Sequence, residues 1–239
     1  MAKDAKSAFC EDSRVKFPTL MHLMGMGFKY VSLKGLKTKY VEAPKTEFDP
    51  LTNILTDYFT DAYCTLNPKA EKKDAEDMLV KIQKSLQNDD LGRQFYNEIL
   101  LNTGERIIDL SSPANFYRNN TFQVTTEMTC GSKDSDNYRP DITIFVNGLP
   151  LAFIEVKKEN NHKGIQAETD RMKQRFVNPQ YRRFLNITQI MVFSNDMEYD
   201  NNEVTPTIGA FYATIGKKNT KYNCFREEIV SLLHGIFTK

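Results

Sequence analysis

The stretch RPDITIFVNGLPLAFIEVKK, residues 139–158, holds two apolar runs joined by Asn147-Gly148. Asn-Gly between two such runs is a strong short-range signal for a β-hairpin, so DITIFV and LPLAFIEV are predicted to be paired strands. The segment LAFIEV is apolar on both faces. It is therefore expected to be a central strand of a sheet that is covered on both sides.

Charged side chains border this hairpin. In a strand, residues two apart face the same way, so Glu155 and Lys157 are expected to project together, about 6–7 Å apart along the chain. Leu151 and Phe153 share their face. A charge at the end of a buried strand needs a partner or a metal ion, because burying it alone is costly.

The position of Asp141 depends on the register of the hairpin. A simple two-residue turn would place Asp141 opposite Ile154, facing away from Glu155. A three-residue connection over 147–149, or an equivalent one-residue bulge, would place Asp141 opposite Glu155 instead. Because Pro150 cannot donate to a strand ladder, we predict the odd-numbered loop or the bulge.

Asp141, Glu155 and Lys157 would then form a site for chemistry on phosphate. Two converging carboxylates repel each other unless one is protonated or a cation lies between them. Oxygen ligands of this kind suit Mg²⁺ or Mn²⁺, and a neighbouring lysine can stabilise charge that develops on a phosphate. The set predicts metal-assisted phosphodiester hydrolysis. A salt-bridged strand end is the alternative, because Asp, a gap of 13 residues and Glu-x-Lys is a degenerate pattern.

The composition is that of a globular protein with a sizeable core. The chain has 239 residues, of which 40% are apolar, and 32 basic residues balance 31 acidic ones. Any DNA-binding surface must therefore be local. No apolar run is long enough to span a bilayer and the start of the chain has no signal-peptide pattern, so a cytoplasmic protein without membrane contact is expected.

The sequence lacks the residue patterns that several kinds of functional site require. The four cysteines form no CxxC pair and are expected to be free buried thiols, and the three histidines have no second ligand at helical spacing. A P-loop motif for ATP is absent from the sequence. These observations argue against a zinc site, a Ser-His-Asp triad and ATP binding by these residues.

The order of the periodic segments predicts an α+β core with a helical N-terminal part. Residues 1–90 are expected to be a mainly helical elaboration of the same compact unit, and residues 91–239 the core. The core begins with strand-like runs, RIIDLSS, NTFQVTTEM and the hairpin. The helix GIQAETDRMKQRFVN, the strands QIMVFSND and GAFYATIG and the helix FREEIVSLLHGIF follow.

The run RPDITIFVNGLPLAFIEVKKENN closely resembles the nuclease motif of the restriction subunit (R, HsdR) of type I restriction–modification enzymes. In that family RPD, an apolar run, NGLP and E-x-K occur in this order, and the resemblance covers most of residues 90–230. It implies an α/β (α+β) restriction-endonuclease-like PD-(D/E)xK core, with a central mixed sheet flanked by helices.

The resemblance also implies roles for individual residues. Asp141 and Glu155 would hold the metal with the backbone carbonyl of Val156, and Lys157 would act at the scissile phosphate. The family tends to carry an acidic residue on an early helix, for which Glu11 and Glu98 are both candidates.

A Gln-x-x-x-Tyr element on the helix after the lysine is a further feature of the family. The equivalent positions here, Met172 and Phe176, lack its polar groups. Gln166, Arg171 and Gln174 are polar substitutes for DNA contact, although exposed helix positions explain the same residues.

By this resemblance the chain is an Mg²⁺-dependent (or Mn²⁺-dependent) endonuclease domain, a type I deoxyribonuclease that cleaves double-stranded DNA without reading its sequence. Methylation and specificity subunits would be its partners, and ATP would act only through a motor domain that these residues lack. The alternatives are a catalytically inactive nuclease-fold module that docks DNA or partner subunits, and a stand-alone repair or recombination nuclease.

Overall fold

The structure of the chain is a computed structural model. It describes residues 15–33, 48–49, 51–130, 138–157, 164–194, 210–214 and 223–224. Side chains are described throughout these ranges except at 164–166, 169, 210–214 and 223–224. The predicted helix FREEIVSLLHGIF lies outside the described residues.

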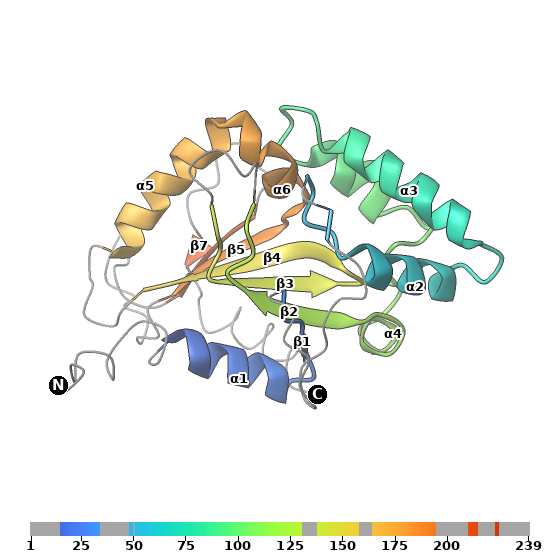
Figure 1. Cartoon of the computed structure of the whole chain (residues 1–239), viewed down its shortest axis with the longest axis horizontal. Helices are drawn as coiled ribbons and strands as arrows, with labels where there is room; N and C mark the ends of the chain where they lie inside the picture. Colours follow the sequence, from blue (N-terminus) through green and yellow to red (C-terminus); the bar gives the residue numbers. More distant parts are fainter. Residues whose placement is uncertain are drawn as a thin grey trace.

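A mixed sheet forms the centre of the molecule (Figure 1). The seven strands in the described ranges follow one another in sequence order across the sheet. The pairs β1–β2 and β4–β5 are parallel and the other neighbours are antiparallel. The strands are β1 (Lys29–Tyr30), β2 (Phe122–Thr126), β3 (Ile142–Val146), β4 (Leu149–Val156), β5 (Ile190–Ser194), β6 (Ala210–Thr214) and β7 (Asn223–Cys224).

Helices cover both faces of this sheet (Figure 1). One face carries α1 alone among the described helices, and the other carries α5 and α6 at one end and α2 and α3 at the other. The helical segments are α1 (Phe17–Gly25), α2 (Thr56–Leu66), α3 (Lys72–Ser85), η3 (Phe95–Leu100), α4 (Pro113–Asn119), α5 (Gly164–Val177), η4 (Pro179–Tyr181) and α6 (Arg182–Ile187). The predicted mixed sheet with flanking helices is confirmed.

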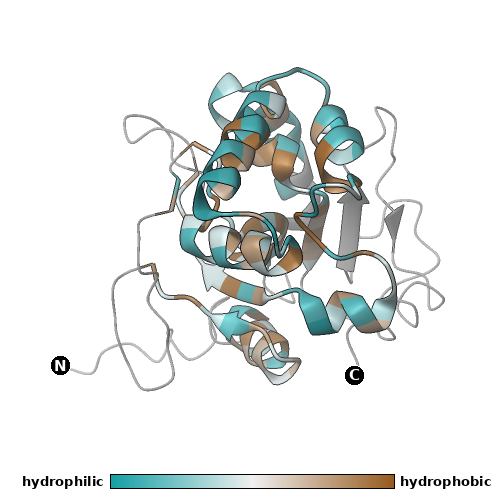
Figure 2. Ribbon diagram, turned by 90° about the vertical axis from the view of Figure 1, so that its right-hand side faces the viewer, coloured by the Kyte–Doolittle hydropathy of each residue, from teal (hydrophilic) through white to brown (hydrophobic). Residues whose placement is uncertain are grey.

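The core lies on both sides of β4, as its two-sided apolar pattern predicts. Phe153 packs with residues of α5 and α6, whereas Ile154 and Val156 pack against α1. The helices show both hydrophobic and hydrophilic stretches in Figure 2, as expected of helices that bury one side. Cys130 is a buried free thiol, as predicted, whereas Cys64 is a free thiol that is only half-buried. Cys10 and the side chain of Cys224 lie outside the described part.

The hairpin joins β3 and β4 by a two-residue turn followed by a bulge. Asn147 and Gly148 both have positive φ, 52° and 76°, which is the conformation of a type I′ turn. Val146 pairs with Leu149, but the ladder then shifts, so that one extra residue, Leu151, separates the two halves of the β4 register. The predicted bulge is confirmed, and the alternative of a three-residue loop over 147–149 is wrong.

The Asn-Gly turn is anchored at the end of the hairpin opposite to Asp141 and Glu155. The Asn147 side chain accepts a hydrogen bond from the Thr121 backbone N–H at 2.7 Å and donates to the Ile107 carbonyl and to Asn120 Oδ1. The Leu55 backbone N–H, just before α2, donates to the Gly148 carbonyl at 2.9 Å. The turn therefore ties the hairpin to three distant segments.

One predicted strand is wrong. Residues 106–112, expected to begin the core as a strand, form a loop in which Ile107 and Ile108 are nevertheless buried. Asp109 organises this loop by accepting hydrogen bonds from Ser111 and Asn119. Local side-chain bonds of this kind compete with strand pairing, so the apolar pair marks a buried loop here.

The N-terminal part contributes to the sheet as well as to the helical layer. β1 pairs with β2, and Val31 continues this contact through its backbone N–H to the Val124 carbonyl at 2.9 Å. The division of the chain near residue 90 stays a prediction. Within the part of the chain that the structure describes, no helix has the length and apolar character of a membrane span.

Candidate active site

The bulge brings Asp141 and Glu155 to the same end of the hairpin. Ile142 pairs with Ile154, so Asp141, one residue before β3, lies opposite Glu155 in the same register. Lys157 directly follows β4, and its backbone N–H donates to the Ser194 carbonyl of β5 at 2.8 Å. The structure thus brings the three predicted residues together at one edge of the central strands.

Glu155 is buried, with 5% of its surface exposed. Burial raises the pKa of its carboxyl group to about 8, and the negative charges of Asp141 and Glu168 act in the same direction. The Tyr138 hydroxyl and Lys157 act to lower this pKa. The Tyr138 hydroxyl itself makes no hydrogen bond within the described part of the chain. Glu155 Oε1 has no hydrogen-bond partner among the described residues.

Asp141 is held by backbone and by a lysine from the other end of the chain. Its Oδ2 accepts a hydrogen bond from the Val156 backbone N–H at 2.9 Å, which fixes the carboxylate beside β4. The Nζ of Lys16, just before α1, lies 3.6 Å from Asp141 Oδ1 and 2.9 Å from Glu127 Oε1. Lys16 is itself buried, and Glu127 has the unusual φ of 51° for a residue other than glycine.

The side chain of Lys157 lies close to the end of β4. Its ammonium donates to the Val156 carbonyl at 3.0 Å and lies 3.4 Å from Glu168 Oε2 on α5. Only 15% of its side chain is exposed. The predicted lysine therefore lies beside the Val156 carbonyl and the Glu168 carboxylate.

Glu168 and Arg175 complete the site and were not among the predicted site residues. Glu168 is 1% exposed, and its two oxygens contact Arg175 at 2.7 Å and Arg171 at 2.8 Å as well as Lys157. Burial alone would raise the pKa of Glu168, but Lys157, Arg175 and Arg171 outweigh it and hold the pKa below its usual range. The spacing of Glu168, Arg171 and Arg175 is a helix-face signal, yet exposed ion pairs produce the same spacing.

The residues of α5 that were predicted to contact DNA have different surroundings. Arg171 is exposed and paired with Glu168, and Gln174 is exposed. Gln166 lies in α5, but its side chain is outside the described part. Met172 is buried in the core and Phe176 packs against it, so both positions serve packing and offer no polar group to DNA. DNA contact by Gln166, Arg171 and Gln174 stays a prediction.

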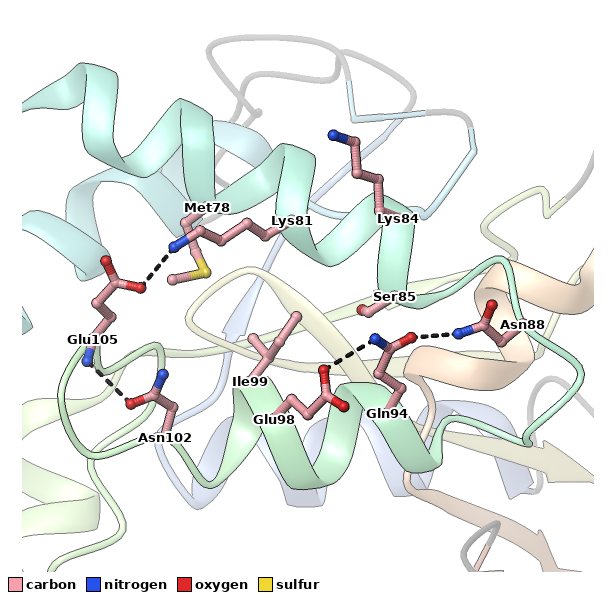
Figure 3. Close-up of a pocket in the computed structure, with 10 residues that line it drawn as sticks. All are labelled: Met78, Lys81, Lys84, Ser85, Asn88, Gln94, Glu98, Ile99, Asn102 and Glu105. Carbon is pink, nitrogen blue, oxygen red and sulfur yellow. Dashed lines mark hydrogen bonds and ion pairs between the residues drawn. The ribbon is translucent and has the colours of Figure 1, made fainter.

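The two candidates for the early acidic residue differ. Glu11 lies outside the described residues. Glu98, on η3, accepts a hydrogen bond from Gln94 at 3.0 Å and lines a surface pocket between α3 and η3 (Figure 3). The other residues that line this pocket come from 78–105, and none of them belongs to the hairpin.

The donor set fits a hard divalent cation. Asp141 and Glu155 supply carboxylate oxygens, and the Val156 carbonyl directly follows Glu155 in the chain. Glu155 Oε1 is a buried acceptor without a hydrogen-bond partner among the described residues. A partly hydrated Mg²⁺ needs only one or two protein carboxylates, because it keeps several waters. The described residues contain no group of three or more His, Cys, Asp or Glu side chains that could hold a metal ion. A hydrated Mg²⁺ does not require such a group.

The chain matches a known protein family. The family model described as "Type I restriction enzyme R protein N terminus" matches residues 9–204. No curated protein matches the chain by sequence. The matched range includes β1 to β5 and every residue of the candidate site.

Proposed function

The chain belongs to the type I restriction enzyme R protein family, of which it represents the N-terminal region, and we propose that it is the metal-dependent nuclease of that subunit. The membership accords with the restriction-endonuclease-like fold, a mixed sheet with helices on both faces. The proposed reaction is the hydrolysis of phosphodiester bonds in double-stranded DNA.

One observation carries this proposal. The bulge at Leu151 places Asp141 opposite Glu155, with Lys157 at the end of the same strand. Without the bulge the two carboxylates would lie on opposite faces of the hairpin, because side chains alternate along a strand. A bulge next to a candidate active site is a recurrent way to direct a side chain.

Each residue of the site has a role in the proposed reaction. Asp141, Glu155 and the Val156 carbonyl would hold Mg²⁺ or Mn²⁺, which would lower the pKa of a bound water and neutralise charge on the phosphate. The Val156 N–H orients the Asp141 carboxylate through its 2.9 Å hydrogen bond. The Lys157 ammonium would donate hydrogen bonds to a non-bridging phosphate oxygen as negative charge develops there.

The proposal extends to the partners. The R protein family implies a multi-subunit enzyme that acts on DNA, so we infer that methylation and specificity subunits supply sequence recognition. The nuclease would then need only phosphate contacts, which carry no sequence information. ATP would be used by a motor segment other than the residues described here.

A docking module without catalysis is the second candidate. Lys16 already lies against Asp141, and Glu168 against Lys157, so the charges of the site are partly neutralised within the chain. Met172 and Phe176 in the core also remove the polar element that the family carries on this helix. A nuclease fold with such a site could serve DNA or subunit contact alone.

Calorimetry with Mg²⁺ and Mn²⁺, followed by nicking of supercoiled DNA, distinguishes the two functions. Wild type is expected to bind metal and to nick, whereas Asp141→Asn and Glu155→Gln lose both properties because each removes a ligand charge. Lys157→Met is expected to bind metal and to nick on the order of 100- to 1,000-fold more slowly than wild type, because it removes one donor to the phosphate. Asp61→Asn, an exposed position on α2, controls for the loss of one negative charge.

Metal binding and nicking that persist in Asp141→Asn would contradict the proposed site. If wild type neither binds metal nor nicks, alone or assembled with its partner subunits, the docking module is the better description.

A further inference from the structure

Glu168 is a buried carboxylate for which the proposed reaction so far has no use. It lies on α5 with 1% of its surface exposed, and it contacts cations from two elements. Arg171 and Arg175 come from its own helix, at 2.8 Å and 2.7 Å. Lys157 comes from the end of β4, at 3.4 Å.

The two arginines alone would balance the charge of Glu168. Because both belong to α5, a purely structural ion-pair cluster would be complete within the helix. The contact with Lys157 is different, since it joins α5 to the strand end that carries Glu155. Glu168 Oε2 is shared between Arg171 and Lys157, so one oxygen links the helix to the site.

Arg175 extends the same link towards Glu155. Its guanidinium lies over the Tyr138 ring, 3.9 Å from the centroid, and its Nη1 is 3.9 Å from Glu155 Oε1. Stacking on the ring and the bond to Glu168 hold the guanidinium in one orientation. Glu168 thus contacts two cations near Glu155. One is Lys157, two residues after Glu155 in the chain, and the other is Arg175, whose Nη1 lies 3.9 Å from Glu155 Oε1.

We propose that Glu168 is a positioning residue, which holds the Lys157 ammonium and the Arg175 guanidinium in place around Glu155 for the reaction at the phosphate. The inference rests on the proposed nuclease function for its catalytic meaning, but the positioning itself is a property of the protein without metal or DNA. It can therefore be measured apart from activity.

The first test is the rate at which Lys157 is acetylated in the metal-free chain, followed by mass spectrometry. In wild type Lys157 is expected to react at least about tenfold more slowly than Lys173, because a buried ion pair protects an amine far better than an exposed one. Lys173 is the matched control, since it pairs with Asp170 on the same helix with 61% of its side chain exposed. Equal rates for the two lysines in wild type would overturn the proposal without any variant.

The second test is Glu168→Gln, which keeps the shape of the side chain and removes its charge. The acetylation rate of Lys157 is expected to rise by roughly tenfold, as its charged partner is lost. Asp170→Asn is the control variant, and it should change the Lys173 rate by no more than about twofold, because exposed pairs are weak. If the acetylation rate of Lys157 in folded Glu168→Gln changes by no more than about twofold, the proposal is overturned.

Unfolding is a possible consequence of removing a buried charge, so circular dichroism and the Tm accompany each sample. If Glu168→Gln does not fold, Glu168→Asp replaces it. Aspartate keeps the charge but is shorter by one methylene, and a partial rise of the Lys157 rate is expected. No rise in folded Glu168→Asp would count against positioning.

Nicking kinetics then test the catalytic meaning. Glu168→Gln is expected to lower kcat on the order of 100-fold, as small misplacements of catalytic groups do, with little change in KM for DNA. In a Lys157→Met background the same substitution is expected to lower kcat much less, because the part of its effect that acts through the lysine is already lost. A structural role would lower activity equally in both backgrounds, which would overturn the proposal.

The two possible failures are distinct. If wild type does not nick DNA but the Lys157 rate responds to Glu168→Gln, the proposed function fails and the positioning stands. If wild type nicks and the Lys157 rate does not respond, the positioning fails and the nuclease function stands.

Discussion

Asp141 accepts a 2.9 Å hydrogen bond from the backbone N–H of Val156, the residue that follows Glu155. This contact is possible only because the bulge in β4 restores the register that brings Asp141 opposite Glu155. The carboxylate is therefore oriented by main chain, and the geometry of the site depends on the hairpin as a whole.

Gly148→Ala is expected to destabilise the protein by at least about 2 kcal/mol. Gly148 has a φ of 76°, and a Cβ there would lie 2.5 Å from the Leu55 carbonyl oxygen and 2.9 Å from the Phe59 nitrogen, both backbone atoms. Urea unfolding measures the change. Gly104→Ala is the control, because its nearest neighbour is a side-chain oxygen at 3.4 Å, and a similar loss there would contradict the steric explanation.

Asn147→Gly separates the side-chain bonds of the turn from its backbone conformation. Glycine accepts the φ of 52°, so the expected loss of roughly 2–4 kcal/mol reflects the bonds lost by the Thr121 backbone N–H and the Ile107 carbonyl. Asn120 Oδ1 also loses a bond but keeps the one from the Asp109 backbone N–H. Asn147→Asp should cost at least as much, since it keeps an acceptor but loses both donated bonds. A milder effect of aspartate in urea unfolding would show that the donated bonds are unimportant.

Lys16→Met is expected to strengthen Mg²⁺ binding by about tenfold, as the removal of one nearby positive charge in a partly buried site should. Lys16 Nζ lies 3.6 Å from Asp141 Oδ1, so it competes with a bound cation for the same carboxylate. Calorimetry provides the measurement, with Lys84→Met on the exposed face of α3 as the control. Weaker binding would mean that Lys16 mainly orients Asp141.

The pH dependence of stability should contain a contribution from Asp109. Its hydrogen bonds from the Ser111 hydroxyl, Asn119 and the Ser111 backbone lower the pKa of its carboxyl group from 3.8 to about 2. A lowered pKa in the folded state means that this contribution is present above about pH 4 and is lost as the pH falls towards 2.

Asp109→Asn should therefore flatten the fall of Tm over that acid range relative to wild type. Asp77→Asn, an exposed position on α3, is the comparison. An unchanged acid profile in Asp109→Asn would show that the loop around Asp109 contributes nothing to the acid sensitivity.

Much of the site follows from local sequence. Asn-Gly between apolar runs determines the hairpin, because only residues that accept positive φ form its two-residue turn. The two-sided apolar pattern of LAFIEV determines a central strand, and the alternation along it places Glu155 with Lys157. Pro150 indicates an irregular connection between the two strands, but a three-residue loop and a bulge both explain it. The position of the bulge at Leu151 therefore does not follow from the sequence.

Packing between distant segments determines which charges join the site. Glu168 and Arg175 lie on α5, where the helical spacing is the same for an exposed ion pair and for a buried one, and Lys16 lies just before α1. Their burial is set by how α1 and α5 pack against the sheet, with Met172 of α5 in the core and Lys16 against Asp141. Local patterns determine the strands and the turn of this protein. Packing between segments far apart in the chain determines which basic side chains lie beside its carboxylates.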